Sequence, residues 1–367
     1  MPAEHSPAQK SFGRSTRLLA VVGVMSLSVL IPMPTDAHAS TATATKLFSV
    51  VRKLSFGDYG PVASIAAIDR ESIFLTGTFE YSSSAPTATL VRVDRKTLRV
   101  VARARLPSIT SVAYGDNALW WATGAPLGNA GTSLTPGHGR LLLKVNPSTL
   151  TVIERFTIPG TTQLVAVAGR SVWVATPTDL YRINPANGGI LATVKISVFP
   201  EAFAPSFNSA SLYVLGDTRN SARTVLTDYS SNSGHLLGTR TVANYSTGPF
   251  AVVRGGVWVP ISSTKTESTT IHLFKGRSFT SASSIGRFTF DTEPYVEGGV
   301  LWLVDAGGRG PTVCADPVNG ARRASGSPLG VGYREMAAFD KGDPYLVRSV
   351  GTNESLLQVV PSKTCSV

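Results

Sequence analysis

The chain has 367 residues, of which 43% are hydrophobic and 16% are charged, so it is long enough to bury a large core. Its net charge is +11, but the basic residues are scattered and form no run of the kind that binds nucleic acid. We therefore exclude specific nucleic-acid binding. The positive charge favours other anionic partners, such as acidic wall polymers or phospholipid head groups.

Residues 1–39 have the pattern of a secretory signal peptide. A basic region is followed by the apolar stretch Leu18–Met33 and by the small-x-small motif Ala37-His38-Ala39. The apolar stretch is short for a membrane span, which favours a cleaved signal over an anchor. We predict a Sec-type leader, export to the extracellular space or the cell envelope, and no integral membrane association. Residues 40–45 form a polar, flexible leader.

Seven related sequence motifs recur along the rest of the chain, and each contains an aromatic residue among apolar neighbours. The aromatic residues lie 40 to 53 residues apart, and they are Phe74, Trp120, Trp173, Tyr213, Trp258, Trp302 and Tyr345. A repeat of this length with one aromatic motif in each copy is typical of a β-propeller, in which every copy is one four-stranded blade. The sequence therefore predicts an all-β, seven-bladed propeller with the aromatic residues packed between blades.

The clearest copy, Gln163–Ile196, shows the four strands of a blade. Apolar runs begin near Leu164, Ser171, Leu180 and Ile190, and we name them strands A, B, C and D. Residues 184–189 have the composition of a tight turn between strands C and D, and similar turns recur in the other copies.

The last copy is incomplete, because the chain ends before a full strand D. The segment Lys46–Phe56 is a spare strand ahead of blade one. Its pairing with blade seven would close the ring and cover an exposed edge. We therefore predict that residues 46–367 form a single propeller domain, closed by an outer strand from the N-terminal side.

The two faces of such a ring differ. We call the face with the B–C and D–A connections the loop face, and the face with the A–B and C–D connections the turn face. The B–C connections are long and irregular, as in Gly124–Gly139, whereas the connections of the turn face are short. Variable loops on a rigid scaffold usually carry binding, so we expect a ligand on the loop face.

Polar residues at the start of strand A would converge on the mouth of the central channel at this face. The aligned positions are Ser64, Thr110, Gln163, Glu201, Thr247, Glu293 and Glu335. Gln163 and the three glutamates are candidate binding residues. Glu201, Glu293 and Glu335 are candidate ligands for Ca²⁺ or Mg²⁺, and Asp305 is either a further ligand or a turn residue. Alternatively, the carboxylates flank channel water and pair with Arg334 or Arg254.

The remaining chemistry-bearing residues are few. Cys314 and Cys365 fall in neighbouring blades, on and just after the third strand, and the sequence leaves open whether they form a disulfide. His138, His235 and His272 are not spaced as a metal pair, and His272 is expected to be a packed strand residue. No motif of a known catalytic nucleophile or phosphate-binding loop is present.

The phrase SVWVATPTDLYRINPANGGILATVKI (Ser171–Ile196) resembles the repeats of secreted bacterial YVTN, NHL and streptogramin-lyase-like propellers. The resemblance covers about residues 51–367 and implies the propeller fold. It transfers no catalytic residue, because the glutamate that follows the aromatic residue in the lyases is absent here. Glu293 and Glu297 are only loosely analogous to the cation site of gluconolactonase-like propellers, since the spacing differs. The tryptophan that docks pyrroloquinoline quinone is also missing.

Two functions from different classes follow from these observations. The first is a secreted, monomeric, non-catalytic binding protein for a protein or an envelope glycan, acting through the loop face. The second is a lyase or lactone hydrolase that depends on a divalent cation at the channel mouth. A purely structural role in the envelope is a third alternative, since propellers host many unrelated activities.

Overall fold

The structure is a computed structural model, and it describes residues 47–56, 62–77, 87–124, 139–206, 208–218, 223–243, 249–263, 266, 268–289, 292–305, 311–326, 333–339, 343–350 and 353–365. The chain divides into the units Met1–Ala42 and Thr43–Val367, and everything below concerns the second unit. All regular structure among the described residues is β-strand. No helix in the described part of the chain is long and apolar enough to cross a membrane.

The strands form seven antiparallel sheets of four strands each, which are the seven predicted blades. Blade one contains β2 (Val62–Ile68), β3 (Ser72–Gly77), β4 (Thr87–Asp94) and β5 (Arg99–Pro107). Blade two contains β6 (Ile109–Gly115), β7 (Ala118–Thr123), β8 (Leu141–Val145) and β9 (Val152–Thr157). Blade three contains β10 (Leu164–Ala168), β11 (Ser171–Ala175), β12 (Asp179–Ile183) and β13 (Ile190–Lys195).

The next three blades repeat the same order. Blade four contains β14 (Val198–Pro205), β15 (Ser211–Thr218), β16 (Thr224–Ser230) and β17 (Leu236–Ala243). Blade five contains β18 (Ala251–Val253), β19 (Gly256–Ser263), β20 (Ser268–Lys275) and β21 (Thr280–Thr289). Blade six contains β22 (Thr292–Glu297), β23 (Val300–Asp305), β24 (Thr312–Ala315) and β25 (Arg322–Gly326).

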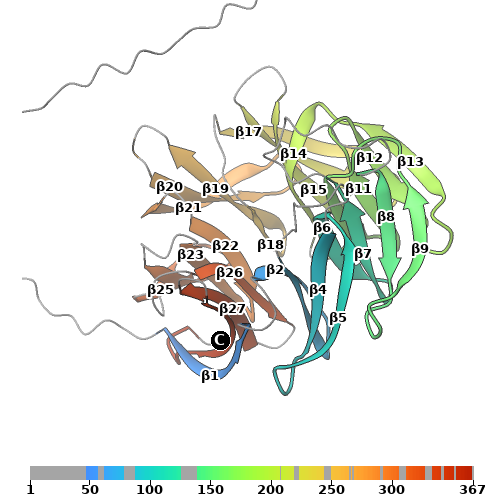
Figure 1. Ribbon diagram of the computed structural model, residues 1–367. Coiled ribbons are helices and arrows are strands. Elements are labelled where there is room, and N and C mark those ends of the chain that lie inside the picture. Colours follow the sequence, from blue (N-terminus) through green and yellow to red (C-terminus); the bar gives the residue numbers. More distant parts are fainter. Residues whose placement is uncertain are drawn as a thin grey trace, which may run out of the picture. The chain divides into compact units, whose positions relative to one another are not determined.

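Blade seven joins the two ends of the propeller, as predicted. It contains β26 (Tyr333–Phe339), β27 (Asp343–Val350), β28 (Asn353–Pro361) and, as its outer strand, β1 (Phe48–Ser55). Strand β1 runs antiparallel to β28, with Phe48 opposite Pro361 and Ser55 opposite Ser355. In Figure 1 the blue β1 lies beside the red strands of this blade. In six of the seven pairs of neighbouring blades, the first strands contact one another around the centre of the ring.

The core lies between the blades, because each sheet buries both faces against its neighbours. The strand-B aromatics Phe74, Trp120, Trp173, Trp258, Trp302 and Tyr345 are at most 1% exposed, which confirms their predicted packing. Trp173 of blade three, for example, shares a cluster with Leu212 and Val214 of blade four. Tyr213 is only partly buried, and its ring packs edge-on against Phe279 of blade five at 6.1 Å.

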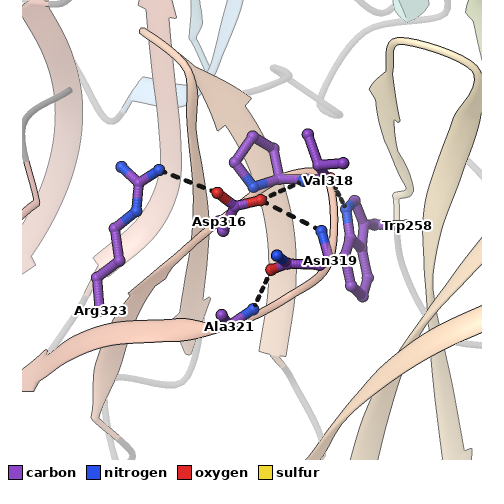
Figure 2. Close-up of polar contacts among 7 residues, drawn as sticks. Trp258, Asp316, Val318, Asn319, Ala321 and Arg323 are labelled. Atoms are coloured by element: carbon purple, nitrogen blue, oxygen red, sulfur yellow. Dashed lines mark hydrogen bonds and ion pairs between the residues drawn. The ribbon is translucent and has the colours of Figure 1, made fainter.

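Several blades also hold the C–D turn of the next blade through polar contacts on the turn face. Lys144 Nζ of blade two donates to the carbonyl of Pro185 in blade three at 2.9 Å. Trp258 Nε1 of blade five donates to the carbonyl of Pro317 in blade six at 2.8 Å, as Figure 2 shows. The short, regular turns predicted from the sequence are therefore joints between blades.

The cysteine pair lies at the same kind of joint. Cys314, in β24 of blade six, forms a disulfide with Cys365, in the turn that follows β28 of blade seven. Both residues are fully buried, and they share a cluster with Trp302 and with Leu47 and Phe48 from the closing strand. The disulfide thus links the last two blades covalently, beside the strand that closes the ring.

Candidate functional site

The predicted site lies where the first strands begin, at the loop face of the central channel. In four blades the register of strand A against strand B skips one residue at this point, which is the mark of a β-bulge. The skipped residues are Ala63, Thr110, Glu201 and Arg334. A bulge leaves one residue unpaired and re-aims its side chain. Strand A is therefore irregular where it begins, at the channel mouth, in these four blades. The periodic pattern of aromatic residues does not reveal this irregularity.

Glu201 is paired with a second carboxylic acid, Asp217, which stands at the end of β15 on the same face. Loss of hydration, the charge of Asp217 and a hydrogen bond between the two side chains raise the pKa of Glu201 from 4.5 to about 7. Thr224 Oγ1 donates to Asp217 Oδ1 at 2.7 Å and fixes the second acid. Glu201 is therefore partly protonated near neutral pH, because two adjacent carboxylates repel each other.

Gln163 lies immediately before β10 rather than within it, and its backbone amide donates to the carbonyl of Ala175 at 2.8 Å. The residue is only 6% exposed, and within the described structure its Oε1 atom has no hydrogen-bond partner. A buried amide oxygen without a partner carries a desolvation cost unless water or a ligand meets it. The sequence predicted that Gln163 lies at the start of the strand, but it could not show that the Oε1 atom is buried without a hydrogen-bond partner.

Glu293 and Asp305 lie together in blade six. Tyr295 Oη donates to Glu293 Oε2 at 2.5 Å, so this carboxylate is engaged within its own strand. Asp305 ends β23 opposite Thr292 and is 3% exposed, so it is a buried strand-end residue. Glu335 lies in β26, but its side chain is outside the described part of the structure, as is residue Thr247.

The structure does not test the cation site made of the three glutamates. Among the residues that it describes, no three Asp, Glu, His or Cys side chains gather in a way that would hold a metal ion. Because the side chain of Glu335 is not among them, the proposed set of Glu201, Glu293 and Glu335 stays a prediction.

Two other expectations have definite outcomes. The suggested pairing of the channel carboxylates with Arg254 is wrong, because Arg254 lies in the turn between β18 and β19, on the turn face. The expectation for His272 is confirmed, since this half-buried residue of β20 stacks on Phe274 at 6.2 Å. Burial lowers the pKa of His272, which keeps the imidazole neutral at neutral pH.

Two hollows lie on the turn face. A hollow of about 590 Å³ is lined by residues of blades seven and one, including Arg52, Arg70, Arg95 and Lys96. A second hollow of about 620 Å³ lies between blades one and two and shares Arg70 and Glu71 with the first. Sequence reasoning missed both hollows, because their residues come from separate turns and from the closing strand.

No protein-family model matches the chain, and no curated protein matches its sequence. Solved structures match the fold. BamB from Moraxella catarrhalis has a TM-score of 0.55 at 11% identity, over 85% of this chain and 100% of that chain. The Pan2 WD40 domain of Neurospora crassa has a TM-score of 0.60 at 9% identity, over 88% of this chain and 98% of that chain.

A third similar structure, hydrazine synthase from Kuenenia stuttgartiensis, has a TM-score of 0.59 at 13% identity, over 89% of this chain and 99% of that chain. At these identities the likeness establishes the fold alone. The chain is a β-propeller of seven four-stranded blades.

Proposed function

We propose that this protein is an exported, monomeric binding protein without catalytic activity, whose loop face takes a protein or an envelope glycan. The predicted leader, Met1–Ala39, carries it to the extracellular space or the cell envelope. The resemblance of its repeats to the YVTN and NHL group of secreted propellers supports the same placement. Three of the 34 basic and two of the 23 acidic residues lie in the leader, which leaves a mature chain with a net charge of +10.

The observation that carries the proposal is the contrast between the two faces. On the turn face, the C–D turns hold the ring together through contacts such as Lys144 to Pro185 and Trp258 to Pro317. On the loop face, the B–C connection runs from Gly124 to Arg140 in blade two but only from Thr176 to Thr178 in blade three. Connections that differ this much are free to vary in sequence, and such loops on a rigid scaffold usually bind ligands.

The similar structures support a binding role without separating it from catalysis. BamB and WD40 domains share the fold, but hydrazine synthase is named as an enzyme and shares it too. The choice between binding and catalysis therefore rests on the site. There the described residues offer polar groups on a rigid scaffold, such as the Gln163 Oε1 atom, which has no hydrogen-bond partner.

Labelling within one blade tests the face assignment. Both native cysteines are in the disulfide, so a cysteine introduced by Thr178→Cys on the loop face, or by Ala186→Cys on the turn face, is the single free thiol. Each variant of the mature protein carries a photoreactive group and is exposed to isolated cell envelope and secreted proteins. We expect one discrete crosslinked species from position 178 and none from position 186. The reverse pattern would overturn the face assignment, and no crosslink at either position would count against a binding role.

A cation-dependent lyase or lactone hydrolase is the second candidate, and the pKa of Glu201 favours it. An acid with a pKa of about 7 is suited to proton transfer at neutral pH. Melting the mature protein in EDTA and then with Ca²⁺ or Mg²⁺ tests this candidate, because an ion that binds the folded state raises the melting temperature. A rise of several degrees that Glu293→Gln abolishes would favour the enzyme. An unchanged melting temperature would exclude the cation.

A further inference from the structure

A hollow with many charged side chains lies on the turn face, at the seam between blades seven and one. Its volume is about 590 Å³, and its lining comes from β1, from two turns of blade one and from β27 and β28. The lining residues are Val51, Arg52, Arg70, Glu71, Asp94, Arg95, Lys96, Tyr345 and Gln358. Four of them are basic and two are acidic, so the hollow carries net positive charge.

A β-bulge directs the closing strand toward this hollow. The register of β1 against β28 skips Val51, since Val50 pairs with Val359 and Arg52 pairs with Gln358. The extra residue leaves Val51 55% exposed and places Arg52 on an open stretch of the strand. The hollow is therefore complete only when the N-terminal strand has closed the ring.

Blade one supplies a rigid platform for three further cations. Asp69 Oδ1 accepts hydrogen bonds from the amides of Glu71 and Ser72, at 2.8 and 2.5 Å, which fixes the turn that carries Arg70. The amide of Arg95 donates to the carbonyl of Glu71 at 2.8 Å, so the A–B and C–D turns of the blade are tied together. Arg70 and Lys96 project from these turns as exposed side chains.

Two of the other charged groups, Arg95 and Asp94, are held by neighbouring residues. Arg95 Nε donates to Tyr345 Oη at 3.2 Å, and its guanidinium lies 5.9 Å from the centre of the Tyr345 ring. Hydrogen bonds from the side chain and amide of Thr97 lower the pKa of Asp94, so this carboxylate is ionised and committed to its own turn. Within the described structure, Arg52, Arg70 and Lys96 form no ion pair with a carboxylate.

We propose that this seam binds the phosphate groups of a polyanionic polymer. Guanidinium groups match the geometry of phosphate oxygens, and several cations on fixed turns bind repeated charges without the cost of ordering the backbone that carries them. The neighbouring hollow of about 620 Å³ extends the surface past Arg70 toward Asn117, Asn146 and Ser148, whose polar groups suit a hydrated chain. The two hollows together form a track across three blades.

The shape of the surface favours a polymer over a lipid bilayer. The charges lie in a recess between blades, which a flexible chain can enter and a flat lipid surface meets only at its rim. Val51 is the exposed aliphatic side chain among the lining residues, so the recess offers little apolar surface for insertion into a membrane. The site is on the turn face and is independent of the loop-face ligand proposed above.

Binding of long-chain inorganic polyphosphate to the mature protein, followed by calorimetry, tests the proposal. The variant Arg70→Gln/Lys96→Gln removes two exposed cations of the seam. The matched control Arg170→Gln/Arg254→Gln removes two exposed cations from turns of blades three and five on the same face. We expect the seam variant to bind at least tenfold more weakly, the control to change less than twofold, and the parent to lose affinity between 50 and 200 mM salt, as contacts to phosphate require.

Three results would overturn the proposal. Equal losses in the two double variants would show attraction by net charge without a site. Unaltered binding in the seam variant would place the contacts elsewhere. Binding to phosphatidylglycerol vesicles but not to polyphosphate would identify a membrane surface instead of a polymer. Because the seam variant leaves position 178 untouched, crosslinking through the loop face is expected to persist in it, so the two proposals fail separately.

Discussion

At Glu201, local backbone geometry and electrostatics act together. The bulge in β14 turns this side chain away from the regular pleat, and Asp217 at the end of β15 lies beside it. The folded protein therefore holds two acidic groups close together, which costs free energy once both are ionised. The neighbouring Asp217 therefore favours the protonated form of Glu201, whether the face binds a ligand or carries out chemistry.

The pH dependence of stability should report this pair. The pKa of Glu201 is about 7 in the folded protein and 4.5 as its ordinary value, so the folded state binds more protons between these limits. Stability therefore falls as pH rises from about 4.5 to 7 and levels off above. In Glu201→Gln the fall should be smaller, so the variant gains on the parent at pH 8 relative to pH 4. Melting temperatures across this range, with Asp116→Asn as a control on the turn face, check the prediction; parallel profiles for parent and variant would contradict it.

Asp316 shows how one turn residue supports a joint between blades. Its Oδ1 atom accepts from the amides of Val318 and Asn319 at 2.8 and 3.2 Å, and its Oδ2 atom lies 3.3 Å from Arg323 Nη2. The same turn supplies the carbonyl of Pro317 to Trp258 of the previous blade (Figure 2). The amides lower the pKa of Asp316, so it stabilises the fold above its unfolded pKa and loses this effect in acid.

Asp316→Ala should therefore destabilise the propeller by about 1–2 kcal/mol at neutral pH, because the two amides lose a charged acceptor. Arg323→Ala should cost less than about 1 kcal/mol, since it removes only a partly exposed ion pair. Urea unfolding of both variants gives the comparison. If Arg323→Ala proves the more harmful of the two, the ion pair rather than the turn stabilises this joint.

At the scale of the element, the size of each turn residue matches the aromatic residue of the preceding blade. One residue near the end of the C–D turn has positive φ in six blades. In five of them it lies near the strand-B aromatic of the blade before, whereas Gly188 lies against Phe156 in strand D of that blade. After Trp120, Trp173 and Trp258 this residue is glycine, namely Gly188, Gly234 and Gly320. After Phe74, Tyr213 and Tyr345 it is larger, namely Leu150, Phe279 and Leu98.

The Trp302 joint departs from this rule, because Cys365 takes the turn position and binds Cys314 covalently. The disulfide thus stands where other blades use hydrogen bonds to the next turn, such as Lys144 to Pro185. This size matching explains why the turn sequences vary although the joints between blades are kept. The strand-B aromatic residue and the turn residue of the next blade together fill the space between the two blades.

Gly320→Ala tests this size rule. A Cβ atom at Gly320 would lie 2.6 Å from the Trp258 ring, and the residue has a φ of 77°. The combined cost of overpacking and of positive φ should be about 2–4 kcal/mol. Gly276 has a φ of 67° but no heavy atom within 4 Å of an added Cβ, so Gly276→Ala should cost only about 1–2 kcal/mol from backbone strain. Chemical unfolding of the two variants separates the terms; equal losses would contradict the rule.

The sequence predicted these elements well where a period governs them. Trp173 and its equivalents fixed the blades, and Lys46–Phe56 was assigned as the closing strand because an incomplete last copy needs a partner. The bulge at Glu201 and its contact with Asp217 were not predictable, since they depend on an insertion that breaks the period. The seam hollow was missed for a related reason: Arg52 and Arg95 are far apart in sequence and meet only after closure.

For the whole molecule, the closing strand joins stability and the proposed seam. Leu47, Phe48 and Phe56 are at most 4% exposed, and they pack with residues of the first and last two blades. Burial of three such side chains contributes about 5–9 kcal/mol, which is comparable to the entire stability of a typical domain. Strand β1 also covers the edge of β28, which would otherwise expose unpaired backbone groups.

Removal of β1 should therefore lower the stability of the propeller far more than removal of residues 40–45. A chain beginning at Lys46 should melt at the temperature of the chain beginning at Ser40, whereas a chain beginning at Gly57 should unfold or associate through the exposed β28 edge. A synthetic peptide of residues 46–56 should restore folding of the shorter chain, because the contacts of β1 need no covalent link to β2. Circular dichroism and sedimentation follow both states. Cooperative melting of the chain from Gly57 at the parent temperature would show instead that the ring is stable without its closing strand.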